Sequence, residues 1–292
     1  MIDLHIHTTS SDGSDEPEDI LIKAQNCGMK YIAITDHDSI GAYEKLKNVQ
    51  IEDYYNGKII PGCEFSVVHN GKPIEVLGYG IDLETINSLG IISDEKFLDR
   101  ENDYLKRLKA VCKNLNIKYS DNLSINKSKY FATQLMHADI RRYPENEQHF
   151  TKEIWENLNA FYRTCVNNEE SPFFLDQTKN YPTVEEIAAI IRKAGGKSFL
   201  AHLYVYFADD LKEFLNSIVS LNALDGLECY HSLHTIDRTY DLLNYCTEHN
   251  LYASGGSDYH GKLKPNVILG DCIPGIKIPY EILEPWLPEN LI

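Results

Sequence analysis

Two short clusters of metal-ligand side chains, one near each end of the chain, most constrain what this sequence can fold into. In residues 2–7, apolar residues alternate with polar ones that include His5 and His7. This period of two is typical of a strand, and it places both histidines on one side, close enough to bind one ion. Asp258 and His260 repeat the spacing. A single buried histidine is usually a core residue, but two such pairs after apolar segments indicate metal binding.

Strand-like and helix-like segments alternate along most of the chain. Residues 31–34 form an apolar strand followed by Asp36 and His37, and residues 197–201 precede His202 in the same way. The alternation predicts a parallel β/α architecture, with the candidate ligands at the C-terminal ends of strands. About seven such strands favour a barrel over an open doubly wound sheet, because active sites of β/α barrels lie at that end.

Two segments depart from this alternation. Asn70-Gly71 is a strong hairpin signal and predicts a tight turn between two strands. Residues 92–182 are polar, rich in Asn, Lys and Tyr, and lack a clear strand. We therefore expect an α/β domain formed by residues 1–91 and 183–292, with residues 92–182 inserted as a mostly helical subdomain.

The composition limits the classes of partner. A formal net charge of −16 at pH 7 repels long duplex nucleic acid, which proteins bind mainly by neutralising phosphates. No apolar run approaches the length of a membrane span, and the first residues lack a signal peptide. The 7 cysteines include no CxxC pair, which favours reduced thiols. We therefore expect a cytoplasmic protein that contacts neither membranes nor long duplex nucleic acid, whereas a small phosphorylated substrate remains compatible.

At these clusters the chain resembles the PHP (polymerase and histidinol phosphatase) family. The matching stretches keep the family's order along the chain: residues 3–8, 11–13, 33–38, 61–64, 201–202 and 256–261. The resemblance implies a distorted (β/α)7 barrel that holds two to three divalent ions. Imidazole and carboxylate ligands without a thiolate independently favour Mn, Fe or Zn over a structural cysteine site.

Carried over position by position, the resemblance implies three ion sites. The first would use His5, His7, Glu64 and Asp258; the second, Glu64, Glu75 and His202; the third, Asp12, His37 and His260. One position departs from the family, which usually has a histidine where this chain has Glu75. Strand alternation still allows Glu75 to point inward as an oxygen ligand, which would favour Mn²⁺ or Fe²⁺ there. A solvated glutamate that binds nothing is the alternative.

Groups beyond the ions are needed to hold a substrate phosphate. Arg141 and Arg142, in the insertion, are candidates for substrate binding, although such a pair is often only a solvated face. His231 and His234 follow the expected strand over 226–230 and could bind phosphate or donate a proton to the leaving oxygen. Together with Asp258 they are the candidate catalytic residues, and surface-loop histidines are the alternative.

These features favour a metal-dependent phosphoesterase in which a metal-bound hydroxide attacks a phosphate ester. The resemblance implies a small substrate: a nucleoside monophosphate, a 3′,5′-bisphosphonucleotide or a short 5′-phosphorylated oligonucleotide. A histidinol-phosphatase-like enzyme, or another metal hydrolase of a C–N or C–O bond, is the second hypothesis. A catalytically silent module is the third, and the near-complete ligand set argues against it. The sequence leaves the oligomeric state open.

Overall fold

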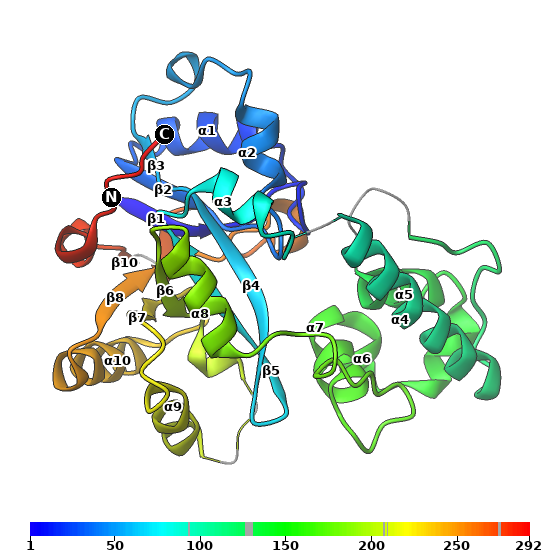
Figure 1. The fold of residues 1–292 in the computed structure, drawn as a ribbon. Helices are drawn as coiled ribbons and strands as arrows, with labels where there is room; N and C mark the ends of the chain where they lie inside the picture. Colours follow the sequence, from blue (N-terminus) through cyan, green and yellow to red (C-terminus); the bar gives the residue numbers. More distant parts are fainter. Residues whose placement is uncertain (93, 126–130, 207, 209, 274–275) are drawn as a thin grey trace. The chain divides into compact units, whose positions relative to one another are not determined.

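The computed structural model describes residues 1–92, 94–125, 131–206, 208, 210–273 and 276–292. The chain divides into two compact units, one formed by residues 1–92 and 181–292 and the other by residues 93–180. The first unit contains the strands β1 to β10 and the helices α1 to α3 and α8 to α10, and the second contains α4 to α7 (Figure 1).

The strands of the first unit form three sheets. β1 (Ile2–Ile6), β2 (Tyr31–Ile34) and β3 (Lys58–Ile59) make a parallel sheet in that order. The second sheet has the order β4 (Gly62–His69), β5 (Lys72–Tyr79), β6 (Lys197–Leu200), β7 (Gly226–Tyr230) and β8 (Tyr252–Gly255). β9 (Asp271–Ile273) pairs with β10 (Ile276–Lys277) as a short antiparallel ribbon.

The long hairpin β4–β5 is confirmed (Figure 1). Asn70 and Gly71 form its turn with φ angles of 48° and 72°, the left-handed backbone that a two-residue hairpin of this kind requires. β5 also pairs antiparallel with β6, whereas β6, β7 and β8 are parallel. The predicted parallel arrangement therefore holds for β6 to β8, whereas the predicted hairpin makes β5 antiparallel, because its tight turn reverses the chain without a helical crossover.

The first two sheets approach each other at single bridges. Ile6 of β1 pairs with Tyr259 after β8, and His37 after β2 pairs with Glu64 of β4. In the described part of the chain the strands do not close into a barrel. The structure thus confirms a mixed α/β fold and does not show the closed (β/α)7 barrel that was predicted.

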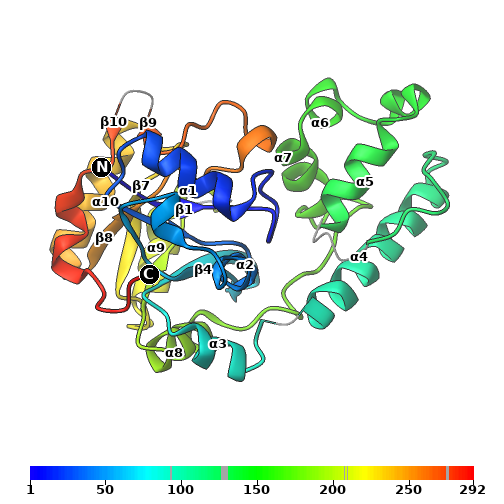
Figure 2. The ribbon, with the colours of Figure 1, turned by 90° about the horizontal axis from the view of Figure 1, so that it is seen from above.

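Helices cover these sheets and continue the alternation. The helices of the first unit are α1 (Pro17–Asn26), α2 (Gly41–Leu46), α3 (Leu83–Ser88), α8 (Val184–Lys193), α9 (Leu211–Val219) and α10 (Ile236–His249). α8 packs against β4, β5 and β6, and α10 packs against β7 and β8 (Figure 2). Thr183 and Glu186 form the capping box that begins α8, which satisfies backbone N–H groups that no helical carbonyl reaches.

Aromatic packing fills the region away from the polar ends of the strands. The Trp286 ring lies 5.4 Å from Tyr79 and 4.6 Å from Phe199, measured between ring centroids. Its indole N–H donates to the Ala253 carbonyl at 2.9 Å. Large buried aromatic side chains contribute strongly to core stability, so this packing helps to hold the sheet together.

The second unit is helical in its described residues. It contains α4 (Asp94–Asn114), α5 (Ala132–Ile140), α6 (Lys152–Glu156) and α7 (Leu158–Phe161), followed by a π-helical turn over Tyr162–Val166. Leu105, Leu108 and Cys112 of α4 pack in an apolar core that is separate from the core of the first unit. Their i, i+3 and i+7 spacing is that of an amphipathic helix. None of the helices that the structure describes has both the length and the apolar character needed to cross a bilayer.

Candidate metal centre

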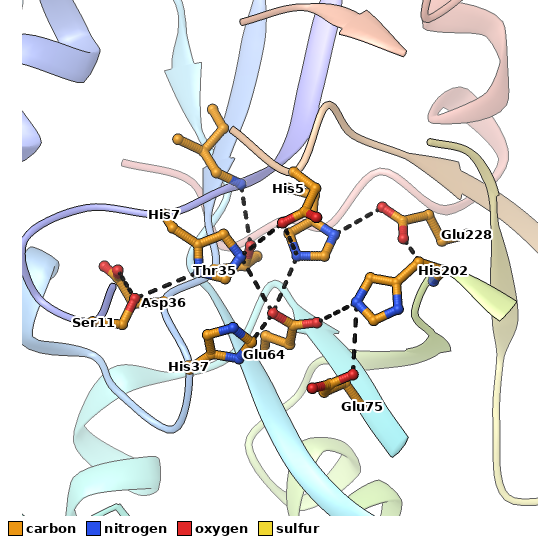
Figure 3. A network of polar contacts seen from close by, with 12 residues as sticks. His5, His7, Ser11, Thr35, Asp36, His37, Glu64, Glu75, His202 and Glu228 are labelled. Atoms are coloured by element: carbon orange, nitrogen blue, oxygen red, sulfur yellow. Dashed lines mark hydrogen bonds and ion pairs between the residues drawn. The ribbon is translucent and has the colours of Figure 1, made fainter. Parts of the chain in front are cut away.

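Glu64 lies at the centre of a cluster of histidines in the first unit (Figure 3). Its Oε2 is 3.2 Å from His5 Nε2, 3.3 Å from His7 Nε2 and 3.1 Å from His37 Nδ1. Its Oε1 is 2.9 Å from His202 Nε2. The carboxylate is thus surrounded by four imidazoles, and the whole Glu64 residue is inaccessible to solvent.

The backbone pairing explains how this cluster forms. His5 and His7 lie at the end of β1, and His202 lies two residues after β6. The Asp258 N–H donates to the His5 carbonyl at 2.9 Å, which joins the segment after β8 to β1. The Asp38 N–H donates to the Glu64 carbonyl at 2.8 Å, which joins the segment after β2 to β4. The sheets therefore meet where the ligand-type side chains lie.

Four groups of side chains have ligand atoms within 4.8 Å of one another. They are His7, Asp12, His37 and His260; His5, Glu64 and His202; His5, His7 and Asp258; and His37, Glu64 and Glu75. The structure thereby brings together all nine residues that the sequence suggested as metal ligands. The groups share His5, His7, His37 and Glu64, so they form one continuous centre.

Glu64 and Glu75 reach this centre from within the two strands of the hairpin. Glu64 is the third residue of β4, and Glu75 is the fourth residue of β5. The expectation that every ligand follows a strand is therefore wrong for these two. In a hairpin, successive side chains point to opposite faces, so the neighbours Ile74 and Val76 pack into the apolar core while Glu75 faces the centre.

Hydrogen bonds fix which imidazole nitrogen faces the centre. His5 Nδ1 donates to Glu228 Oε1 at 2.9 Å, and His260 Nδ1 donates to the Asp258 carbonyl at 2.9 Å. In a neutral imidazole the other nitrogen then carries a lone pair. His5 Nε2 faces Glu64 Oε2 at 3.2 Å, and His260 Nε2 faces Asp12 Oδ1 at 3.2 Å. Two acceptors at such distances need a cation or a proton between them.

These residues fit divalent cations. His7 Nε2 is buried without a hydrogen bond among the described residues, although Glu64 and Asp258 oxygens lie 3.3 and 3.4 Å away. Buried carboxylates are costly unless positive charge compensates them. Neutral imidazoles and carboxylates are ligands for first-row divalent ions such as Mn, Fe and Zn. The cluster therefore has the donors, the burial and the charge that a multinuclear metal centre requires.

Electrostatics within the cluster point the same way. Burial alone lowers the pKa of His7, but the Asp258 and Glu64 carboxylates raise it to about 9. Burial alone raises the pKa of Glu64, but the charges of His37 and His5 hold it well below its usual value. The centre therefore stabilises positive charge beside ionised carboxylates.

Asp258 uses its two oxygens differently. Oδ1 lies 3.8 Å from His5 Nε2 and 3.4 Å from His7 Nε2. Oδ2 accepts hydrogen bonds from His231 Nε2 at 3.2 Å and from Lys264 Nζ at 2.6 Å. Asp258 has a φ of 58°, a left-handed conformation that aspartate tolerates better than most residues.

Three supporting carboxylates were missed by the sequence analysis. Glu228 accepts from His5 Nδ1 and, through Oε2, from the His202 backbone N–H at 2.8 Å. Asp36 accepts from the hydroxyls of Thr8 and Ser11, and Asp3 accepts from Ser257 and Gly270. Groups of this kind orient the ligands of metal sites. The inward alternation of residues 226–230 was the available signal for Glu228.

Glu75 lies at the edge of the centre. Its Oε2 is 3.7 Å from His202 Nε2 and 3.4 Å from the Tyr206 hydroxyl, and its side chain is 30% exposed. Burial and the nearby Glu64 charge raise the pKa of Glu75. A carboxylate in this position can bind a cation through oxygen.

His231 and His234 are buried, so the alternative that they are surface-loop residues is wrong. His231 donates to Asp258, and His234 Nδ1 donates to the Cys229 carbonyl at 2.9 Å. The two rings lie 5.2 Å apart between centroids. Burial, followed by the neighbouring His231, lowers the pKa of His234 to about 3. His231 therefore contacts the centre directly through Asp258, and His234 lies next to His231.

Arg141 and Arg142 lie in the helical unit, directly after α5. Both residues are exposed. The Arg142 Nη1 lies 3.5 Å from Asp139 Oδ1.

Comparisons with known proteins agree with this geometry. The sequence profile of the PHP domain matches residues 3–195. The chain is 25% identical over 265 residues to the phosphoribosyl 1,2-cyclic phosphate 1,2-diphosphodiesterase of Eggerthella lenta, covering 89% of this chain and 94% of that one. It is 25% identical over 277 residues to the 5′-3′ exoribonuclease Rnm of Escherichia coli, covering 89% and 85%. A crystal structure from Bifidobacterium adolescentis, described as a metal-dependent phosphoesterase, superposes with a TM-score of 0.72 at 21% identity, covering 98% and 95%.

Proposed function

Because this chain belongs to the PHP domain family, we propose that it is a metal-dependent phosphoesterase that hydrolyses a phosphate ester of a small substrate. The observation that carries this proposal is the buried Glu64 carboxylate with four imidazoles around it. Glu64 would help to hold divalent cations at this position, and such cations would supply positive charge for a phosphate group.

Two to three divalent ions, Mn, Fe or Zn, would occupy the centre. The residues that would hold them are His5, His7, Asp12, His37, Glu64, Glu75, His202, Asp258 and His260. Such ions supply Lewis acidity for the phosphoryl oxygens and lower the pKa of a coordinated water.

The chain's own residues position this chemistry. Glu228 holds His5 in one tautomer and orientation, which keeps Nε2 directed at the centre. His231 and Lys264 hold Oδ2 of Asp258, which leaves Oδ1 for the ligand histidines. Asp258 and His231 would therefore act on the phosphate group that reacts. His234, whose ring lies next to that of His231, would assist them.

The substrate class follows from the relatives and from charge. The two curated relatives are named as a phosphodiesterase of a cyclic ribose phosphate and as an exoribonuclease. The net charge of −16 disfavours a long polyanion, whose distant phosphates meet repulsion. The relatives and the charge are both compatible with a small substrate: a nucleoside monophosphate, a 3′,5′-bisphosphonucleotide or a short 5′-phosphorylated oligonucleotide. His234 would bind the phosphate that is not cleaved, and Arg141 and Arg142 are further candidates for substrate binding.

Two structural proposals accompany this function. The bridges Ile6–Tyr259 and His37–Glu64 support the proposal that the first two sheets form a distorted (β/α)7 barrel around the centre. The described residues in 93–180 form helices and turns without a strand, which supports the proposal that residues 92–182 are an inserted subdomain between the segments 1–91 and 183–292 of one domain.

A substrate screen tests the function. Protein purified with Mn²⁺ is expected to release phosphate or nucleotide from the small phosphate esters named above. Amide and lactone substrates are assayed in parallel, because related histidine-rich centres hydrolyse C–N and C–O bonds. Turnover of an amide or lactone without any phosphate ester would contradict the proposal, as would degradation of long duplex DNA without activity on mononucleotides.

Glu75 provides a separate test of the metal assignment. Glu75→Gln removes a charged oxygen ligand and is expected to lower metal content by up to one ion per chain. Glu75→His offers a nitrogen instead, and it is expected to keep the metal content while shifting the preference towards Zn²⁺, because imidazole is the softer ligand. Elemental analysis after competition between Mn²⁺ and Zn²⁺ measures both effects. Wild-type content and preference in both variants would show that Glu75 binds no ion.

A further inference from the structure

The loop after β8 carries a lysine into the centre. Lys264 Nζ lies 2.6 Å from Asp258 Oδ2, while the lysine side chain keeps 31% of its surface exposed. The loop is held in place: the Lys262 N–H donates to Ser14 Oγ at 2.8 Å, and the Lys264 N–H donates to the Gly261 carbonyl at 3.3 Å. The backbone that carries the ammonium is therefore anchored to Ser14 and within its own turn.

Gly261 allows this loop to approach closely. Its φ is 65°, and a Cβ atom there would lie 2.1 Å from Ser14 Oγ. A side chain at this position would push apart the segment with Ser14 and the segment with His260 and Lys264. The close approach is thus built into the backbone between His260 and Lys264.

Other lysines on this side of the sheets are engaged elsewhere. Lys23 pairs with Asp15 and the Tyr259 hydroxyl, and Lys45 pairs with Thr9 and Glu16. An ammonium has three N–H donors. Among the described residues, the hydrogen bond of Lys264 Nζ goes to Asp258, which leaves donors for an anion.

We propose that Lys264 binds an oxygen of the phosphoryl group that is being cleaved. The proposal rests on the proposed function and adds a substrate-contacting residue to it. One Asp258 oxygen faces the ligand histidines and the other accepts from Lys264. Nζ and the ligand histidines therefore lie on the two oxygens of one carboxylate, so a single phosphate can contact both Nζ and the metal centre.

This position gives Lys264 a defined role in catalysis. A charge-assisted hydrogen bond from an ammonium to a phosphate oxygen is stronger than a neutral one. Lys264 also adds positive charge at a place where Asp12, Glu64 and Asp258 bring negative charge. A phosphate dianion that enters the centre is therefore met by a cation of the protein in addition to the metal ions.

Direct binding of inorganic phosphate tests the proposal. Metal-loaded wild-type protein, Lys264→Met and Lys264→Arg are titrated with phosphate by calorimetry, and metal content is measured on the same samples. Lys264→Met is expected to weaken phosphate binding about 10- to 100-fold, the range for one lost hydrogen bond to a charged group. Lys264→Arg is expected to recover most of the affinity. Lys262→Met is the matched control, because Lys262 is exposed in the same loop and its backbone makes the bond to Ser14.

The outcomes separate three roles. Unchanged phosphate affinity in Lys264→Met would overturn the proposal, and a loss of metal in that variant would show that Lys264 only holds Asp258. If Lys264→Met does not fold, Lys264→Gln replaces it, since an amide can still donate to Asp258 without carrying charge. Phosphate binding that depends on Lys264, in a protein that hydrolyses no phosphate ester, would leave this site standing and reject the proposed function.

Discussion

Asp258→Asn is expected to lower the kcat/KM for phosphate-ester hydrolysis by about a thousandfold or more, with the fold retained. Loss of a residue that only orients a metal ligand costs about 10- to 100-fold, and Asp258 is itself placed as a ligand whose Oδ1 lies 3.4 Å from His7 Nε2. The amide keeps the shape of the side chain but removes the charge that holds a cation. Hydrolysis rates and metal content of the purified variant measure the effect.

The backbone at Asp258 determines how this variant is designed. Asparagine tolerates the left-handed φ of 58° better than alanine does. Asp258→Ala should therefore lose both activity and some stability, whereas Asp258→Asn should lose activity with a near wild-type Tm. Asp271→Asn is the control, because it removes a carboxylate that pairs with Lys277 outside the centre. Wild-type turnover in Asp258→Asn would remove this residue from the catalytic machinery.

Glu64→Gln is expected to have the largest effect on metal content. Glu64 contacts four imidazoles through two oxygens, so it is placed to serve two ions at once. Glutamine keeps one acceptor oxygen and turns the other into an N–H donor, which cannot bind a cation. We expect the loss of more than one ion per chain, together with loss of turnover, as measured by elemental analysis and by the phosphate-release assay.

Glu228→Gln offers a graded comparison for Glu64→Gln. Glu228 accepts a hydrogen bond from His5 Nδ1–H and is not itself a ligand candidate, so its loss should weaken metal binding only about 10- to 100-fold. The number of bound ions at saturating metal should stay as in the wild type. Equal losses in the two variants would show that Glu64 supports the histidines and does not bridge ions.

The structure brings together the nine candidate ligands that the sequence suggested, whereas it does not show the barrel that was expected around them. His5 and His7 could be placed on one side of a strand because alternation is a local property of the chain. The hairpin turn at Asn70 and Gly71 was equally local, since these residues adopt the positive φ that the turn requires. The barrel was less accessible, because closure depends on how distant strands pair. The structure joins its two larger sheets by the single bridges Ile6–Tyr259 and His37–Glu64.

The positions of Glu64 and Glu75 show the same limit. Both residues were recognised as ligand candidates and the hairpin strand that contains Glu75 was predicted, although the candidate ligands in general were expected at the C-terminal ends of strands. The tight turn makes β5 antiparallel, so these side chains enter the centre from within the hairpin. Alternation predicted the face of the sheet to which Glu75 points. Its position along the strand, relative to the other candidate ligands, depends on the pairing of β5 with β4 and β6.

What the sequence by itself determined is the chemistry: imidazoles and carboxylates at fixed local spacings, within a strongly acidic chain that alternates strands and helices. The tertiary structure alone decided which of these groups support one another. Glu228 orients His5 across 223 positions of the sequence, and Lys264 reaches Asp258 because the loop after β8 rests on Ser14. Local periodicity fixes the side to which a residue points, but contacts between distant residues depend on strand register and loop closure, which no short stretch of the chain encodes.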